Sequence, residues 1–186
     1  MGAVYLVRHT DLQQDFALKL LHGHIASDPG FRERFLREAK AATAFTHKHA
    51  IQIRDFGQEK DMLYMTMDFS RGETLWSILN REGALSEMRV ALIAQQVLNA
   101  LREAHLAGLI HRDLKPENIM LVREKDGSDT AVIMDFGLAK QRKADPSMAK
   151  LTATGIILGT PEFMSPEQIR GKSIDARSDV YALGIV

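Results

Sequence analysis

The residues best suited to chemistry lie in residues 110–120, which read IHRDLKPENIM. They bring an acid, a lysine and an amide together at Asp113, Lys115 and Asn118, and a second acid, Asp135, follows in a DFG triplet. Asp113 can orient a hydroxyl group and accept its proton, while Lys115 can hold a phosphate during its transfer. Asn118 and Asp135 offer the hard oxygen ligands that Mg²⁺ prefers. Each residue alone is a weak signal, but together and in this order they indicate phosphoryl transfer.

The composition excludes several classes of protein. The chain has 186 residues, of which 45% are hydrophobic and 26% charged, as in an ordinary globular protein of one domain or slightly more. Lys plus Arg and Asp plus Glu both number 24, so no global charge favours nucleic acid or an anionic membrane as partner. The absence of cysteine rules out disulfides and thiol-based metal or redox sites. No apolar run approaches the roughly 20 residues of a membrane span, and the N-terminus lacks the layout of a signal peptide.

Two differently patterned parts of the chain must position these residues. The first third has β-rich runs at residues 3–9, 15–21, 51–56 and 63–69. One helix is expected to open at residues 27–30, because apolar residues then recur at helical spacing, at Phe31, Phe35, Ala39 and Ala42.

Further along, the pattern becomes helical. Residues 75–79 predict a short helix, and the longest amphipathic helix is expected to begin at Ser86 and to end at Gly108. Its predicted apolar stripe consists of Val90, Ile93, Ala94, Val97, Leu98 and Leu101. Residues 118–122 and 131–136 are expected to pair as a hairpin. The candidate catalytic and metal-binding residues therefore follow the boundary between the strand-rich and the helix-rich part. Clefts between two such parts commonly bind ligands.

Several separated motifs occur in a fixed order along the chain. They are FALK at residues 16–19, HRDLKPEN at 111–118, DFG at 135–137 and SPE at 165–167. On these motifs the chain resembles the eukaryotic-like (Hanks-type) serine/threonine protein kinases, most closely their bacterial branch, over essentially its whole length. The resemblance implies an α+β, two-lobed protein kinase-like fold that is incomplete, with a strand-rich N-lobe over residues 1–70 and a partial helical C-lobe over residues 71–186. It also implies transfer of the γ-phosphate of ATP, with Mg²⁺, to serine or threonine hydroxyls of proteins.

The resemblance adds two catalytic residues from the N-terminal part. Lys19 resembles the strand lysine that contacts the α- and β-phosphates of ATP. Glu38 falls on the helix face that also carries Phe31 and Phe35, and its natural partner is Lys19, an ion pair that marks the active state in the family. Read without the motifs, Lys19 would be a solvated strand lysine and Glu38 a surface acid paired with Arg34.

The residues around the nucleotide are likewise implied by the resemblance. Gly2 corresponds to the third glycine of the glycine-rich loop, and Met67 to the gatekeeper position. The other cofactor-binding positions are Val4, Ala17, Lys19, Asp68, Ser70 and Met120. Of these, Val4, Ala17 and Met120 would sandwich the adenine ring, although the same three residues also fit a plain apolar core.

A regulatory loop is expected to follow the DFG triplet. Arg112 resembles the arginine of kinases that are activated by phosphate on this loop, and Thr152 and Thr154 occupy matching positions. The alternative is two unmodified loop threonines. Lys115 indicates a serine/threonine-specific type, in which Thr160 lies near the acceptor hydroxyl as a substrate-docking residue.

Both ends of the chain are expected to be cut short. In the resemblance the first strand and the first two glycines of the glycine-rich loop precede Met1, and Val186 falls about one turn into the central helix. Asp179 in that helix is expected to brace the catalytic-loop backbone, His111 to be packed rather than catalytic, and Glu167 to lack the arginine with which it normally pairs. We therefore expect a fragment with little activity of its own, taken from an active parent protein.

Two other functions are weighed against this one. A non-catalytic nucleotide-binding or scaffold module is disfavoured for the parent protein because Lys19, Asp113 and Asp135 are all present. A small-molecule kinase is disfavoured because residues 138–167 read as a peptide-docking loop. The expected partners are protein substrates and a second kinase copy for trans-autophosphorylation, with no nucleic acid and no membrane segment in this chain. The expected location is the cytoplasm, with room for a membrane anchor beyond Val186.

Overall fold

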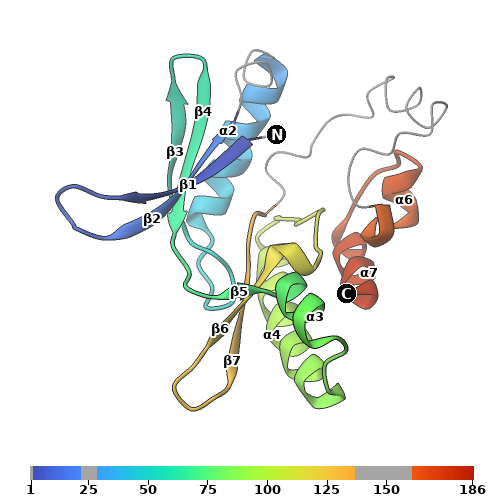
Figure 1. The fold of residues 1–186 in the computed structure, drawn as a ribbon. Helices are drawn as coiled ribbons and strands as arrows, with labels where there is room; N and C mark the ends of the chain where they lie inside the picture. Colours follow the sequence, from blue (N-terminus) through green and yellow to red (C-terminus); the bar gives the residue numbers. More distant parts are fainter. Residues whose placement is uncertain (1, 22–28, 137–160) are drawn as a thin grey trace.

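A computed structural model describes residues 2–21, 29–136 and 161–186 of the chain. The N-terminal part is a four-stranded antiparallel sheet in the order β1-β2-β4-β3. Its strands are β1 (Gly2–Arg8), β2 (Asp15–Leu21), β3 (Ile53–Glu59) and β4 (Met62–Asp68), and helix α2 (Pro29–Ala44) packs against it. Figure 1 shows this sheet and α2 as one layered unit.

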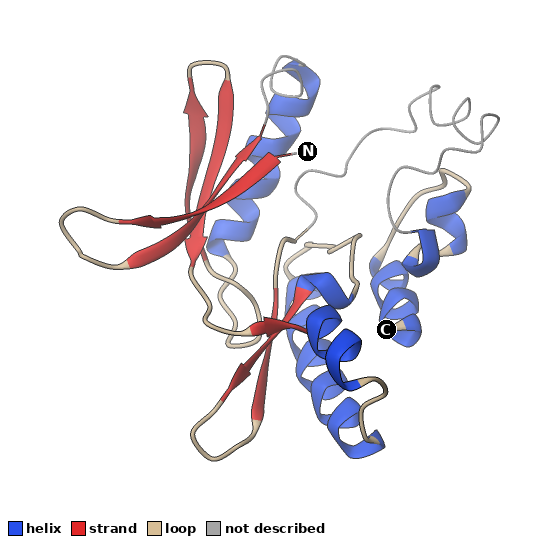
Figure 2. Ribbon diagram, in the orientation of Figure 1, coloured by secondary structure: helices blue, strands red, loops and turns tan. Residues whose placement is uncertain are grey.

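The C-terminal part combines a second sheet with several helices. Its three strands, in the order β5-β6-β7, are β5 (Glu73–Thr74), β6 (Ile119–Arg123) and β7 (Asp129–Ile133). Helices α3 (Leu75–Glu82) and α4 (Glu87–Leu106) pack beside this sheet, and α6 (Pro166–Ile169) and α7 (Ala176–Ile185) follow. The described residues of this part also form two 3-10 turns, η1 (Pro116–Asn118) and η2 (Pro161–Phe163). In Figure 2 the helices of this part lie beside its antiparallel strands and do not alternate with them along a parallel sheet, which confirms the α+β prediction.

Helix ends fall where local chemistry places them. Ser86 caps α4 by accepting a hydrogen bond from the N–H of Arg89, and Thr74 caps α3 through the N–H of Ser77. Gly108, with φ of 76°, lies in the left-handed region just beyond α4, as its glycine predicts. The predicted strand over residues 131–136 is too long, because β7 ends at Ile133.

Each part has its own apolar core. The predicted stripe of α2 is confirmed, since Phe31, Phe35, Ala39 and Ala42 are all buried. The stripe predicted for α4 is partly wrong, because Val90 and Leu98 are 49% and 44% exposed. The face that is buried instead consists of Ile93, Val97, Ala100, Leu101 and Ala104.

The two parts are joined by more than the chain between β4 and β5. Ala50 forms a parallel bridge with Ile133 of β7, and the N–H of Ile51 donates to the carbonyl of Ile133 at 2.8 Å. His49 is buried beside this bridge, and its Nδ1 lies 2.9 Å from the carbonyl oxygen of Ala131. These contacts fix the N-terminal sheet against the strand that leads into the DFG triplet.

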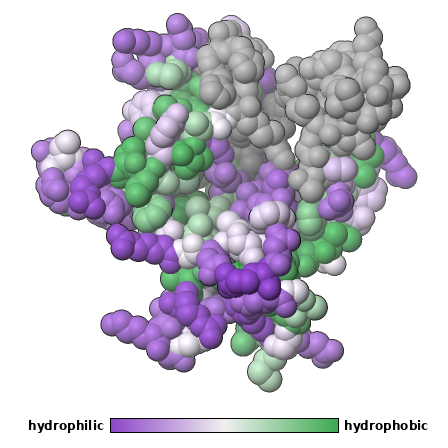
Figure 3. All heavy atoms as spheres, in the orientation of Figure 1, coloured by the Kyte–Doolittle hydropathy of each residue, from purple (hydrophilic) through white to green (hydrophobic). Residues whose placement is uncertain are grey.

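Apolar surface remains over both parts of the molecule (Figure 3). It includes Val4 and Leu6 of β1, which are 60% and 62% exposed, and Val180 and Ile185 of α7, which are 53% and 49% exposed. Within the described ranges, no helix combines the length and apolar character needed to cross a bilayer.

Candidate active site

The loop between α4 and β6 carries the predicted catalytic residues, and a buried acid holds its backbone. Asp179 of α7 is 1% exposed and accepts hydrogen bonds from the N–H groups of His111 (2.8 Å) and Arg112 (2.7 Å). His105 Nε2, on α4, lies 2.8 Å from the same carboxylate. The bracing role predicted for Asp179 is therefore confirmed, and His105 is a partner that the sequence pattern did not indicate.

His111 is packed inside the loop, as predicted, with 0% exposure. Burial lowers the pKa of His111 below its usual range, so its ring is neutral near pH 7. Its Nε2 lies 2.8 Å from the carbonyl oxygen of Met134 and therefore carries the proton. Its Nδ1 then accepts from the N–H of Asp113 at 3.3 Å. The ring thus links the strand before Asp135 to the backbone of Asp113.

Asp113 and Asn118 are brought together as predicted. Asn118 Nδ2 donates to the backbone carbonyl of Asp113 at 2.7 Å and to its Oδ2 at 3.2 Å. Lys115 Nζ lies 3.9 Å from Glu117 Oε1. The hydrogen bond from the Asn118 amide to Oδ2 orients the Asp113 carboxylate, the group predicted to accept a proton from a hydroxyl.

The ion pairs differ from the prediction. Lys19 Nζ binds Asp135 Oδ2 at 2.8 Å, while Glu38 Oε1 binds an Arg112 guanidinium nitrogen at 3.2 Å. These contacts replace the expected Lys19–Glu38 pair, and they give Arg112 a carboxylate where a phosphothreonine was expected. The position of α2 brings Glu38 within reach of Arg112 in the catalytic loop, and Lys19 forms its ion pair with Asp135 instead.

The residues predicted to bind Mg²⁺ have suitable chemistry. Both bonds from the Asn118 side chain to Asp113 use Nδ2, which leaves the role of metal ligand to the amide oxygen. Asp135 lies two residues beyond the end of β7, and its carboxylate pairs with Lys19. One carboxylate and one amide suit Mg²⁺, which takes few protein ligands when phosphates complete its shell. Among the described residues no group of three or more His, Cys, Asp or Glu gathers as a metal site.

The predicted nucleotide-binding residues line up on neighbouring strands. Val4 pairs with Lys19, and Ala17 pairs with Met67, so all four meet on adjoining positions of β1, β2 and β4. Gly2 pairs with Leu21 at the edge of the same sheet, and a Cβ there would lie only 1.9 Å from the Leu20 carbonyl oxygen.

Asp68 is the last residue of β4, where the connecting segment to β5 begins, and its backbone N–H is already bonded. The N–H of Asp68 donates to the Gln52 carbonyl at 2.9 Å, and its side chain binds Arg54 through two bonds of 2.5 and 2.7 Å. The N–H of Asp68 is therefore not available to an adenine ring, which leaves its carbonyl group for that role.

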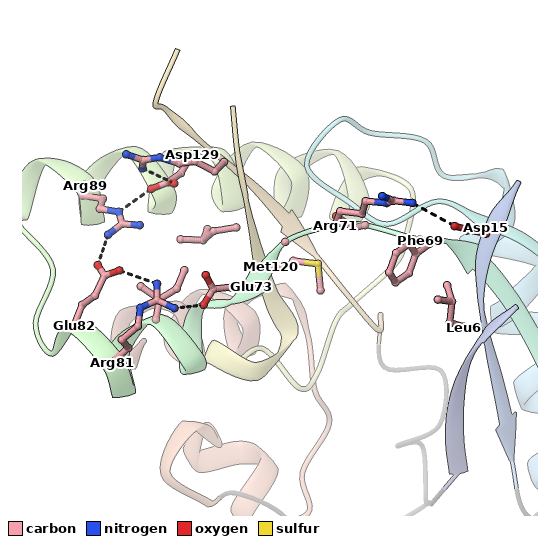
Figure 4. Close-up of a pocket in the computed structure, with 15 residues that line it drawn as sticks. Leu6, Asp15, Phe69, Arg71, Glu73, Arg81, Glu82, Arg89, Met120 and Asp129 are labelled. Carbon is pink, nitrogen blue, oxygen red and sulfur yellow. Dashed lines mark hydrogen bonds and ion pairs between the residues drawn. The ribbon is translucent and has the colours of Figure 1, made fainter. Parts of the chain in front are cut away.

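A hollow of about 1010 Å³ opens along this segment (Figure 4). Of the residues predicted to bind the nucleotide, Ser70 and Met120 line this hollow, together with Leu6 and Phe69. Ala17, Lys19 and Met67 are not among its lining residues, so the hollow lies beside the predicted phosphate-binding residues and does not contain them. Its far end carries a chain of ion pairs that sequence reasoning missed, running from Glu73 through Arg81, Glu82 and Arg89 to Asp129. Burial acts to raise the pKa of Asp129, but hydrogen bonds from Arg89 and Arg123 outweigh it and hold that pKa below its usual value.

The C-terminal helices contact the catalytic loop through two neighbouring side chains. Glu167 Oε1 accepts a hydrogen bond from Ser178 Oγ at 2.5 Å. Glu167 was expected to lack its usual arginine partner, and the sequence did not predict Ser178 as a partner. Gln168 Nε2 donates to the carbonyl of Arg112 at 2.8 Å. Thr152, Thr154 and Thr160 lie outside the described residues.

Comparison with known proteins agrees with this arrangement, which is that of a two-lobed protein kinase fold. A model of the protein kinase domain matches residues 1–186. The chain is 46% identical over 187 residues to serine/threonine-protein kinase pkn3 of Myxococcus xanthus, covering 100% of this chain and 34% of pkn3. It is 38% identical over 190 residues to PknB of Mycobacterium tuberculosis, covering 100% of this chain and 29% of PknB.

Solved structures agree with the sequence relatives. The PknI kinase domain of Mycobacterium tuberculosis superposes with a TM-score of 0.76 at 34% identity, over 98% of this chain and 66% of that one. The chain thus spans about a third of the length of the curated relatives it matches. It belongs to the protein kinase domain family, and the curated relatives named above are bacterial serine/threonine-protein kinases.

Proposed function

We propose that the protein is a serine/threonine protein kinase that transfers the γ-phosphate of ATP to a protein hydroxyl. Residues 1–70 would form its N-lobe and residues 71–186 part of its C-lobe. The single observation that carries the proposal is the pairing of Asn118 Nδ2 with Asp113 Oδ2 at 3.2 Å, because it orients one carboxylate beside a predicted metal ligand. Family membership supports it independently.

In the proposed reaction the acceptor hydroxyl bonds to the γ-phosphorus as the bond to the bridging oxygen of ADP breaks. Asp113 accepts the hydroxyl proton, and Lys115 balances charge on the moving phosphoryl group. Lys19 leaves Asp135 and binds the α- and β-phosphates instead. Asn118 and Asp135 would hold Mg²⁺, whose charge neutralises the phosphates. The remaining rate gain comes from holding the two reactants in line.

Regulation is proposed to act on Arg112. In this structure Glu38 occupies its guanidinium, with both side chains less than a fifth exposed. A phosphate on Thr152 or Thr154 carries more charge than Glu38 and would compete for Arg112. Glu38 would then be released to pair with Lys19. Phosphorylation would come from a second kinase copy, and the substrates would be cytoplasmic proteins.

The activity is tested by radiolabelled phosphate transfer with the full-length protein and two variants, Asp113→Asn and Lys19→Met. We expect labelling by the unaltered protein, a loss of about 10²-fold or more for Asp113→Asn and a comparable loss for Lys19→Met. Equal labelling in all three would refute the assignment. A non-catalytic nucleotide-binding module would instead show a thermal shift with Mg-ATP and no transfer by the unaltered protein.

The regulation is tested by comparing phosphatase-treated and autophosphorylated protein, with the double variant Thr152→Ala, Thr154→Ala. We expect autophosphorylation to raise kcat in the unaltered protein and to leave the double variant unchanged. If treatment changes neither protein, or changes both alike, phosphate on these threonines does not control Arg112.

A further inference from the structure

Gln168 touches the backbone directly before Asp113, although it lies in the segment that follows the SPE motif. Its Nε2 donates to the Arg112 carbonyl at 2.8 Å, and its Oε1 accepts from the N–H of Ser165 at 2.9 Å. The second bond fixes which end of the amide is oxygen, so the nitrogen must face Arg112. Gln168 is therefore an oriented donor rather than a side chain that happens to lie nearby.

The bond of Gln168 matters because of the peptide unit it holds. Arg112 has φ of 65°, a left-handed conformation that costs a non-glycine residue energy and persists only when its surroundings enforce it. Its N–H is held by Asp179 at 2.7 Å and its carbonyl by Gln168 at 2.8 Å. The N–H at the other end of the same peptide unit, that of Asp113, is held by His111 Nδ1 at 3.3 Å.

Both the carbonyl and the N–H of the peptide unit between Arg112 and Asp113 are therefore hydrogen-bonded. The plane of this unit sets the direction in which the Asp113 side chain extends from the backbone. The two hydrogen-bond partners of this peptide unit come from different elements. His111 belongs to the loop itself, whereas Gln168 belongs to α6, which Glu167 ties to α7 through its hydrogen bond with Ser178.

We propose that Gln168 is a positioning residue for the proposed kinase reaction, holding the Arg112–Asp113 peptide unit so that the Asp113 carboxylate meets the acceptor hydroxyl. The inference rests on the proposed function. It also connects α6, which lies at the end of the peptide-docking loop expected over residues 138–167, to the backbone of the proposed base through one hydrogen bond. Gln168 acts through Asp113 and does not touch substrate.

The variant Gln168→Glu tests the two hydrogen bonds of the Gln168 side chain separately. A carboxylate keeps the acceptor for the Ser165 N–H but presents an oxygen to the Arg112 carbonyl, so it repels where the amide attracts. When protonated, the same acid supplies an O–H in place of the lost N–H. Its usual pKa is about 4.3, and a facing carbonyl oxygen raises it. Activity relative to the unaltered protein should therefore recover as the pH falls.

The experiment measures kcat and the KM for ATP of full-length Gln168→Glu and Gln168→Met, each as a ratio to the unaltered protein, from about pH 7.5 to about pH 5. At the upper pH we expect kcat to fall about 10- to 100-fold in both variants, with the KM for ATP unchanged. Towards the lower pH only Gln168→Glu should recover. The charged and titrating neighbours, which are Asp113, Glu167, Asp179, His111 and Arg112, are common to all three proteins and cancel in the ratio.

Gln58→Glu is the matched control. Gln58 also donates through Nε2 to a backbone carbonyl, that of Lys60 at 2.7 Å, but at an exposed turn of the N-terminal sheet. It should leave kcat unchanged at every pH. Unaltered kcat in both Gln168 variants, or equal losses without acid recovery of Gln168→Glu, would overturn the inference. Failure of the unaltered protein to transfer phosphate would instead refute the proposed function.

Discussion

Asp179→Asn is the substitution that most directly tests how the catalytic loop is held. The carboxylate of Asp179 is 1% exposed and accepts three hydrogen bonds of 2.7 to 2.8 Å, from Arg112, His111 and His105. Asparagine has nearly the same shape but only one oxygen. If that oxygen keeps His111 and His105, the new NH₂ group faces the N–H of Arg112, and two donors oppose each other.

The size of the effect follows from that geometry. Leaving one buried donor unsatisfied costs about 1–3 kcal/mol, and losing a charge-assisted bond adds to it, so we expect a total of about 3 kcal/mol. For a chain of this size each kcal/mol shifts Tm by about 2–4 °C, so Tm should fall by about 6–12 °C. Since the strained Arg112 loses one of its two backbone anchors, kcat should fall as well.

The assay is thermal unfolding followed by circular dichroism, with Asp175→Asn as control. Asp175 caps the same helix, α7, and is exposed, and asparagine caps a helix about as well as aspartate. Its Tm should change little. If Asp179→Asn unfolds at the temperature of the control, the three bonds do not stabilise the loop as argued.

Two further predictions concern stability. Burial lowers the pKa of His111, so as the pH falls below about 6.5 the unfolded chain binds a proton at this histidine before the folded protein does. The free energy of unfolding should therefore decline below that pH. His111→Gln should make the decline shallower without abolishing it, because the pKa of His49 is also lowered. Urea unfolding at a series of pH values measures the slope, and identical slopes would contradict the argument. Gly72→Ala should destabilise the protein by about 1–3 kcal/mol, because its Cβ would lie 2.5 Å from the Leu121 carbonyl oxygen; an unchanged urea midpoint would show that β5 and β6 adjust freely.

Local patterns in the sequence predicted local structure well. The apolar spacing of α2 identified all four of its buried residues, and Ser86 and Gly108 marked the ends of α4. These features depend on chemistry within one helical turn. The stripe predicted for α4 was partly wrong because Val90 and Leu98, at the edge of its apolar face, are exposed. Which edge of that face is covered depends on the neighbouring elements, and here the small residues Ala100 and Ala104 face the core.

The proposed catalytic residues could be predicted to lie together because they are close in sequence. Asp113 and Asn118 lie five positions apart, and η1 turns them towards each other. Gln168 was missed for the opposite reason. It lies 56 positions from Arg112, and its partner is a backbone carbonyl, which every residue possesses. No residue type at Arg112 could have indicated that bond.

The ion pairs show the limit of sequence reasoning most clearly. The sequence predicted that Glu38 would pair with Lys19 and that Arg112 would bind a phosphothreonine. In the structure Glu38 binds Arg112, and Lys19 binds Asp135. Their side chains are 15% to 36% exposed, and pairs that retain solvent contact contribute about 1 kcal/mol or less. Exchange of partners therefore costs little in itself. In the proposed reaction and regulation, a bound triphosphate would attract Lys19 and a phosphothreonine would attract Arg112, each with more charge than a carboxylate. The sequence shows which four residues are present but not which of them pair. The proposed regulation requires that the pairs change when a nucleotide or a phosphothreonine binds.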